Sequence, residues 1–134
     1  MSLSSDDEHA REDFFQAYVS FIRDVECLAE SPEVASKMQG NYNVAHEFWC
    51  LIPRTDYFLR APVKLLSDEQ RSAVESLLFA ISKVPPEARK WTTVSQESVE
   101  NLRHSSWEST RKQAKQVCDL LRPVTALMVK HFSS

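Results

Sequence analysis

The chain of 134 residues contains only one glycine, Gly40. Hairpin turns, β-bulges and phosphate-binding loops depend on glycine, because it adopts positive φ values without steric cost. Its near-absence argues against a sheet protein and excludes the glycine-rich fingerprints of Rossmann and P-loop domains. The motifs of serine hydrolases, zinc peptidases and zinc deaminases are absent as well. The sequence therefore predicts no cofactor and favours a protein that is not an enzyme.

Cysteines and long apolar segments are also scarce. The three cysteines, Cys27, Cys50 and Cys118, are far apart and form no C-x-x-C pair, so we expect free thiols in a reducing compartment. No run of about 18 apolar residues occurs, and the first residues are polar and acidic, without the apolar segment of a signal peptide. These features predict a cytoplasmic protein without a membrane partner. Residues 1–5 are expected to be disordered or vector-derived.

Charge is modest over the whole chain but uneven along it. The net charge is −3 and the isoelectric point is about 5.8. Such a chain has no global basic field, which makes nucleic acid an unexpected partner. Residues 1–30 contain eight acidic and two basic side chains, a local charge of −6. The last 32 residues contain six basic and two acidic side chains.

Apolar residues recur at steps of three and four, which is the spacing of a buried helical face. One stripe runs from Phe14 to Ala29 and ends before Pro32. With 43% hydrophobic and 26% charged residues, a chain of this length forms one domain with its own core. We predict an all-α, single-domain helical bundle over residues 1–134, with about four longer helices and two or three short ones.

Capping and helix-breaking residues indicate where the helices begin and end. Residues 5–8 and 67–70 have the spacing of capping boxes, and Asn43 is placed to cap another helix. Pro53 is expected to break or kink the helix that Asn43 begins. A long continuous helix is expected over residues 95–122, with Ser95 as its cap.

The metal-site candidates are weak. Glu100, His104 and Glu108 follow one another at four-residue steps, so a continuous helix places them in a row on one face. Helical di-metal sites need Glu-x-x-His motifs, and none occurs here. A solvated face of local ion pairs is the favoured interpretation. A metal-binding or enzymatic bundle that uses these three residues, in a homodimer if the site spans two copies, is one alternative function.

His46 and Cys50 are also four residues apart. A single His/Cys pair supplies two ligands where zinc needs three or four, although a thiol beside an imidazole is one form of activated nucleophile. We expect both side chains to be exposed or partly exposed.

A second alternative function is binding of single-stranded nucleic acid. The stretch Arg54–Lys64 interleaves basic residues with aromatic ones and follows Trp49, a composition that suits base stacking. It suits a protein contact equally well, because Arg, Tyr and Trp dominate binding hot spots. The favoured interpretation is structural: Phe58 and Leu59 plug one end of the bundle.

A polar step interrupts the apolar face of the predicted helix over residues 95–122. Arg103, Ser106 and Thr110 fall where apolar residues are expected. Three interpretations are open, in order of preference. The helix projects beyond the bundle, Arg103 reaches a buried carboxylate, or the stretch lines a groove together with Trp107.

The function predicted from these observations is binding of another protein, as an adaptor, inhibitor or immunity-type partner. An acidic first helix and an excess of aromatic side chains carry this prediction, together with the lack of any catalytic motif. Neutralisation of the two chain ends by each other is the competing explanation for the acidic helix. The predicted partner-binding residues are Asp13, Asp24, Glu30, Trp49, Arg54, Tyr57, Arg103 and Trp107.

Overall fold

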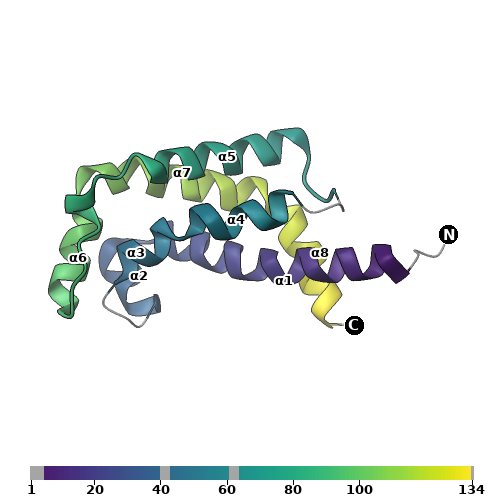
Figure 1. Ribbon diagram of the computed structural model, residues 1–134, viewed down its shortest axis with the longest axis horizontal. Helices are drawn as coiled ribbons and strands as arrows, with labels where there is room; N and C mark the ends of the chain where they lie inside the picture. Colours follow the sequence, from purple (N-terminus) through teal and green to yellow (C-terminus); the bar gives the residue numbers. More distant parts are fainter. Residues whose placement is uncertain (1–4, 40–42, 61–63, 134) are drawn as a thin grey trace.

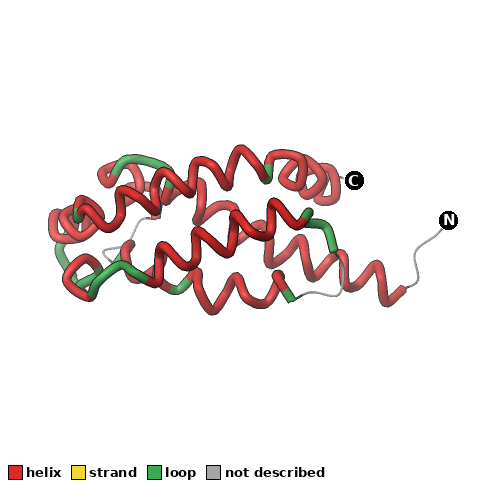
Figure 2. Tube along the Cα trace, turned by 90° about the horizontal axis from the view of Figure 1, so that it is seen from above, coloured by secondary structure: helices red, strands yellow, loops and turns green. Residues whose placement is uncertain are grey.

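All regular secondary structure in the described residues 5–39, 43–60 and 64–133 of the computed structural model is helical (Figure 2). The elements in chain order are α1 (Ser5–Leu28), α2 (Pro32–Gln39), α3 (Val44–Trp49), α4 (Leu51–Leu59), α5 (Asp68–Ser82), the 3-10 helix η1 (Pro86–Ala88), α6 (Ser95–Arg103), α7 (Ser105–Leu120) and α8 (Arg122–Ser133). The predicted all-α class is confirmed. None of these helices is long and apolar enough to cross a membrane.

Four helices, α1, α5, α7 and α8, have 12 residues or more, as the sequence indicates. Four others have 6 to 9 residues, one more than the prediction allowed. α7 packs between α1 and α5, α4 lies along α1, and α8 crosses α1 near its N-terminal half (Figure 1). α6 lies at the opposite end of the molecule, against α2, α3 and η1. The prediction for residues 1–4 falls outside the described residues, whereas Ser5 is the first residue of α1.

The core follows from the stripe on α1. Phe14, Tyr18 and Phe21 are buried, and their rings surround the ring of Phe58 from α4. The Tyr18 hydroxyl is 2.8 Å from the Thr125 hydroxyl, which ties α8 to α1. Burying one such large side chain contributes roughly 1.5–3 kcal/mol. Phe58 and Leu59 therefore belong to the core, as the structural interpretation of this stretch predicts.

The helix that contains Pro53 breaks three residues before the proline. α3 ends at Trp49 and α4 begins at Leu51, so Pro53 lies in the first turn of α4. A proline is tolerated there because the first backbone N–H groups of a helix have no intrahelical acceptor. In a continuous helix the Pro53 ring would clash with the backbone carbonyl of the residue four positions earlier, Trp49. Trp49 is the residue at which α3 ends.

The prediction of one continuous helix over residues 95–122 is wrong. The chain leaves the helical region at His104, where ψ is 140°, and α7 starts at Ser105. The His104 side chain then caps α7, because its Nδ1 atom accepts a hydrogen bond from the Ser106 N–H at 3.2 Å. Neither glycine nor proline marks this break. The Ser105-x-x-Glu108 spacing, typical of a helix start, was the available signal.

Of the predicted helix caps, the one at Ser67 is present and the one at Asn43 is absent. The capping box at Ser67 and Gln70 is confirmed, with both reciprocal hydrogen bonds present at 3.1 and 2.8 Å. Asn43 does not cap α3 with its side chain. Its Oδ1 atom accepts a hydrogen bond from the Thr92 N–H at 2.9 Å instead, which joins two segments 49 residues apart.

The three thiols are free, as predicted, and they differ in environment. Cys27 is buried and its thiol donates to the Ala35 carbonyl at 3.3 Å. Burial raises the pKa of Cys27 and of Cys118 to about 11. Cys50 is partly exposed, and its Sγ atom lies 3.5 Å from His46 Nε2.

Alkylation should therefore be selective among the thiols. At pH 8 we expect iodoacetamide to modify Cys50 well before Cys118 or Cys27, since only the thiolate reacts and burial suppresses it in the latter two. Peptide mass spectrometry after brief labelling measures the order. Modification of Cys27 before Cys50 in the folded protein would contradict this part of the structure.

Candidate functional site

Trp91 is the most exposed of the large hydrophobic side chains in the described residues, at 74%. It lies in the segment between η1 and α6, at the end of the molecule that α6 forms. An exposed tryptophan leaves a large apolar area in water, which folding normally removes. The position of Trp91 therefore needs an explanation other than core packing.

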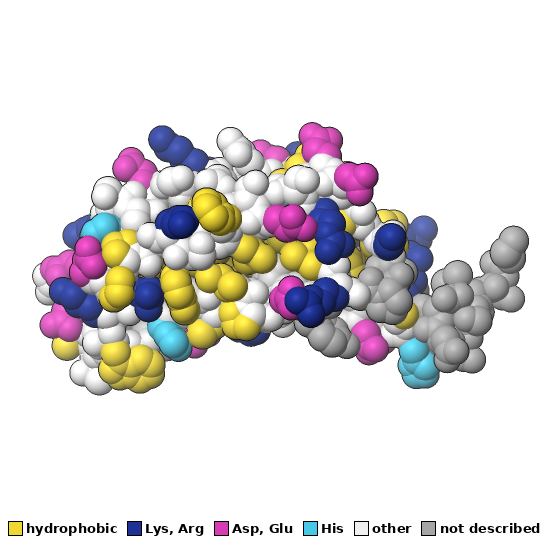
Figure 3. Space-filling view, turned by 45° about the horizontal axis from the view of Figure 1, so that its top comes forward, with side chains coloured by type: hydrophobic (Ala, Val, Ile, Leu, Met, Phe, Trp, Pro, Cys, Tyr) yellow, Lys and Arg dark blue, Asp and Glu magenta, His cyan; other side chains and the backbone are white. Residues whose placement is uncertain are grey.

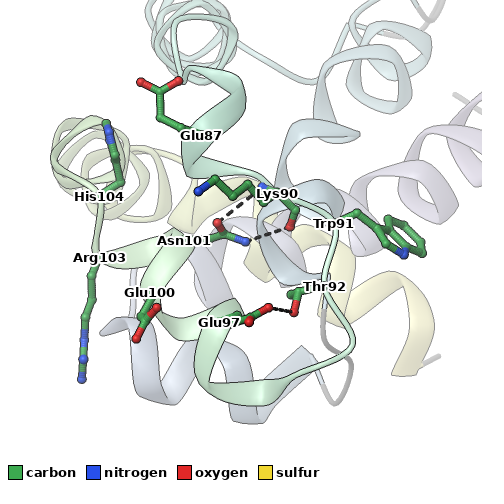
Figure 4. Close-up of a pocket in the computed structure, with 9 residues that line it drawn as sticks. All are labelled: Glu87, Lys90, Trp91, Thr92, Glu97, Glu100, Asn101, Arg103 and His104. Atoms are coloured by element: carbon green, nitrogen blue, oxygen red, sulfur yellow. Dashed lines mark hydrogen bonds between the residues drawn. The ribbon is translucent and has the colours of Figure 1, made fainter.

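The backbone on one side of Trp91 is fixed by a buried amide. Asn101 on α6 is 7% exposed, and its Oδ1 atom accepts a hydrogen bond from the Lys90 N–H at 3.3 Å. The Asn101 Nδ2 group donates to the Lys90 carbonyl at 2.9 Å. One side chain thus satisfies both backbone groups of Lys90 (Figure 4).

The backbone on the other side of Trp91 is fixed at Thr92. The Thr92 N–H donates to Asn43, and the Thr92 hydroxyl donates to Glu97 Oε2 at 2.6 Å. The same hydroxyl accepts from the Val94 N–H at 3.0 Å. Trp91 is consequently held between two anchored residues, while its side chain points outward.

A cleft of about 520 Å³ opens beside this segment. One wall is the exposed face of α6, where Glu97, Glu100 and Arg103 recur at every third position. In Figure 4 the Trp91 ring points away from the centre of the cleft, and it makes an edge contact with His46 of α3 at 5.8 Å. The lining residues are Glu87, Lys90, Trp91, Thr92, Glu97, Glu100, Asn101, Arg103 and His104. We call this set the α6 surface.

Acidic side chains outnumber the available cations on the α6 surface. Arg103 is occupied, because it donates to Glu33 of α2 from Nε at 3.0 Å and also from Nη2. This hydrogen bond lowers the pKa of Glu33, which stays ionised at neutral pH. Glu87 and Glu100 are exposed and carry no ion pair to a described residue. Lys90 is the remaining cation among the lining residues. The surface therefore carries a small excess of negative charge and has an aromatic edge.

Two of the predicted partner-binding residues differ in exposure: Arg103 is at the surface and Trp107 is in the core. Arg103 is exposed and lines the cleft. Trp107 is 0% exposed, and its indole N–H donates to the Ala88 carbonyl at 2.8 Å, so its assignment to a partner-binding surface is wrong. The break at His104 turns α7 so that Trp107 faces the core, where its ring meets Phe48. The groove interpretation of the polar step thus holds for Arg103 and fails for Trp107.

The other two interpretations, a helix that projects beyond the bundle and an Arg103 that reaches a buried carboxylate, are wrong. Thr110 is fully buried, with its hydroxyl donating to the Trp107 carbonyl at 2.8 Å, so this part of the chain does not project beyond the bundle. Ser106 lies 2.9 Å from His104 Nδ1. The carboxylate partner of Arg103, Glu33, is exposed rather than buried.

The acidic residues predicted on the first helix do not form one patch. Asp24 is only 19% exposed at its side chain and accepts from Gln39, with Arg54 3.7 Å away. Its charge is therefore neutralised internally, by a residue of α4 rather than by the chain end. Asp13 and Glu30 are exposed, but 17 positions of α1 and the following turn separate them. Glu12 forms a hydrogen bond with His131 of α8.

The Arg54–Lys64 stretch offers little for base stacking. Phe58 is in the core, and Arg54 donates to the Glu47 and Cys50 carbonyls. Trp49 is partly buried, with the Arg89 guanidinium 3.8 Å above its ring. Hydrophobic side chains are visible across the middle of the face shown in Figure 3. Trp49 itself packs against the core.

The other aromatic and basic residues of the Arg54–Lys64 stretch are Tyr57, Arg60 and Lys64. The Tyr57 side chain lies outside the described residues. Arg60 pairs with Asp56 of its own helix at 3.1 Å, and Lys64 is exposed.

The helix break also removes the geometry behind the metal hypothesis. Glu100 belongs to α6, which ends at Arg103, and Glu108 belongs to α7, so they do not share one helical face with His104. Among the described residues, no group of three His, Cys, Asp or Glu side chains is arranged to hold a metal ion. His46 and Cys50 are exposed and partly exposed, as expected.

Comparison of the chain with protein-family models, with curated proteins and with solved structures gives no match. Sequence reasoning missed Trp91 and its supporting residue Asn101. The available signal was that Trp91 lies between Pro85-Pro86 and Ser95, where no apolar stripe accounts for a tryptophan.

Proposed function

We propose that this protein binds a basic segment of a partner protein through the α6 surface, with Trp91 at its aromatic edge as the main contact. The observation that carries the proposal is the anchoring of Lys90 and Thr92 on either side of an exposed tryptophan. Ordering a loop on binding costs free energy, and a loop that is already fixed avoids this cost. Tryptophan is also among the residues that contribute most to protein interfaces.

The charge of the α6 surface supports a partner with arginine or lysine. Glu87 and Glu100 are exposed beside the Trp91 segment, and Arg103 is already paired with Glu33. A guanidinium group stacks well on an indole ring and pairs with nearby carboxylates. An acidic partner would instead meet excess like charge. The three free thiols support a reducing, cytoplasmic location as part of this proposal.

Trp91→Ala tests the proposal. Tagged wild-type protein and the variant are used to capture partners from a lysate of the cells that make the protein. We expect the main wild-type partner to be lost, because removing a hot-spot side chain weakens binding by about thirtyfold or more. Phe79→Ala is the matched control, since Phe79 is another exposed aromatic residue, at 65%, on α5. Equal capture by Trp91→Ala and wild type would contradict the proposal.

Charge reversal separates the α6 surface from the acidic first helix. Glu100→Arg should slow association with the captured partner at low salt, because charges at the edge of an interface mainly affect the rate of encounter. Asp13→Arg removes an exposed acidic residue of α1 and should leave that rate nearly unchanged. Association rates measured by surface plasmon resonance at two salt concentrations show which of the two surfaces binds the partner. A slower rate for Asp13→Arg alone would favour the first helix instead.

A further inference from the structure

A thiol and an imidazole lie in contact at the surface where α3 ends. His46 of α3 is exposed, and Cys50, the residue after α3, is partly exposed. The Cys50 N–H donates to the His46 carbonyl at 3.0 Å, so the helical spacing continues to Cys50 and brings both side chains to one face. The Cys50 Sγ atom lies 3.5 Å from His46 Nε2. We call these two residues the His46–Cys50 pair, a nucleophile beside a base.

The imidazole of this pair also contacts Trp91. The two rings meet edge to face with their centroids 5.8 Å apart. Trp91 itself lies between Lys90 and Thr92, whose backbone groups are anchored. His46 therefore has a fixed neighbour in addition to the thiol, which limits the orientations of its ring.

The Arg54 side chain contacts Cys50 as well, but two carboxylates already share its charge. Arg54 Nε donates to the Cys50 carbonyl at 3.1 Å. The Arg54 guanidinium also lies 3.6 Å from Glu47 and 3.7 Å from Asp24. The group that can take the thiol proton is the imidazole, because Nε2 is an acceptor when the neutral ring carries its proton on Nδ1.

The contact suits thiol–disulfide exchange better than metal binding or hydrolysis. One His and one Cys supply two ligands, where zinc needs three or four. Acyl transfer also needs donors that stabilise an oxyanion. Disulfide exchange passes negative charge from one sulfur to another, so it needs only a thiolate that the disulfide can reach. A partly exposed thiol beside an imidazole meets this requirement.

We propose that Cys50 is a modification site that takes up a small-molecule disulfide as a reversible mixed disulfide, with His46 as its base. His46 Nε2 takes the thiol proton, and the Cys50 thiolate attacks one sulfur of the disulfide. A bond forms between that sulfur and Sγ while the original S–S bond breaks. The electron pair goes to the departing thiolate, which takes the proton from the imidazolium. Cys50 is oxidised by the disulfide, and an excess of a free small thiol reverses the step.

Incubation of the reduced full chain with oxidised glutathione at pH 7, followed by peptide mass spectrometry, tests the site without any partner protein. We expect the adduct on Cys50 to form at least about tenfold faster than on Cys27 or Cys118, because burial raises the pKa of both of those thiols to about 11. Dithiothreitol should remove it. An adduct mainly on Cys27 or Cys118, or none while a free cysteine peptide reacts, would overturn the proposal.

His46→Gln tests the role of the base. A free thiol is mostly protonated at pH 7, so loss of the imidazole should slow adduct formation about fivefold or more. At pH 10 a thiol ionises without a base, while arginine and carboxylate side chains keep the charge that they have at pH 7. The rates of wild type and variant should therefore agree within about twofold at pH 10.

His9→Gln is the matched control, since His9 is another exposed histidine, on α1, and its loss should leave the rate unchanged at both pH values. Because His46 is exposed, His46→Gln should keep the circular dichroism spectrum of the wild type. The role of His46 is contradicted if His46→Gln reacts like the wild type at pH 7. It is also contradicted if the variant stays equally slow at pH 10, which would indicate altered access to the thiol.

Discussion

Trp107→Ala is expected to lower the free energy of unfolding by about 3–5 kcal/mol, the usual cost of deleting a large buried aromatic side chain. Trp107 is completely buried, contacts the Phe48 ring at 6.0 Å and donates its indole N–H to the Ala88 carbonyl. Alanine leaves a cavity and also leaves that carbonyl without its donor. Since domains are typically stable by only about 5–15 kcal/mol, this variant should unfold at a much lower urea concentration.

Two other substitutions divide this loss into its causes. Trp107→Phe keeps an aromatic ring but removes the indole donor. Its free energy of unfolding should therefore lie between that of the wild type and that of Trp107→Ala. Trp91→Ala removes the same side chain from an exposed position and should stay within about 0.5 kcal/mol of wild type. Urea unfolding followed by circular dichroism measures all three. A Trp107→Ala midpoint equal to that of the wild type would show that Trp107 is not in the core.

Asn101→Ala should lower the stability of the segment that carries Trp91 and weaken partner binding without touching the partner. The variant loses both hydrogen bonds to the Lys90 backbone, at a cost of about 1–3 kcal/mol if those groups are not rehydrated. The segment then samples other conformations, and binding must order it again.

Hydrogen exchange measures the release of this segment directly. The Lys90 amide should exchange at least tenfold faster in Asn101→Ala than in wild type, while amides at the centre of α1 keep their rates. Glu100→Ala, one position away and exposed, is the matched control and should leave the Lys90 amide protected. Unchanged exchange at Lys90 in Asn101→Ala would contradict the anchoring role of Asn101.

The parts of the fold that depend on local sequence were predictable. The stripe on α1 became the buried face with Phe14, Tyr18 and Phe21, because a single helix presents residues at three- and four-residue steps together. The capping box at Ser67 was correct because both of its partners lie within four residues.

The parts that depend on distant contacts were not predictable. Asn43 has the sequence signature of a helix cap, yet its side chain accepts from Thr92, which only the folded chain brings near. The break at His104 requires no glycine or proline, because ψ near 140° is open to any residue and the His104 ring itself caps the next helix.

The candidate site was the least predictable part. Trp91 and Trp107 are the same residue type 16 positions apart, and sequence reasoning chose Trp107 for the surface. The choice depended on a continuous helix, and the break at His104 turns Trp107 inward. Trp91 is exposed because Asn101, Asn43 and Glu97 hold its neighbours, none of which a helical pattern reveals.

Isothermal titration of the captured partner into wild type, Trp91→Ala and Phe79→Ala tests the central claim most directly. If the anchored Trp91 is the main contact, the dissociation constant should rise about thirtyfold or more for Trp91→Ala and less than twofold for Phe79→Ala. All three proteins should unfold at similar urea concentrations, so that a difference in binding reports on the surface. A Trp91→Ala protein that binds the partner within twofold of wild type would contradict the account.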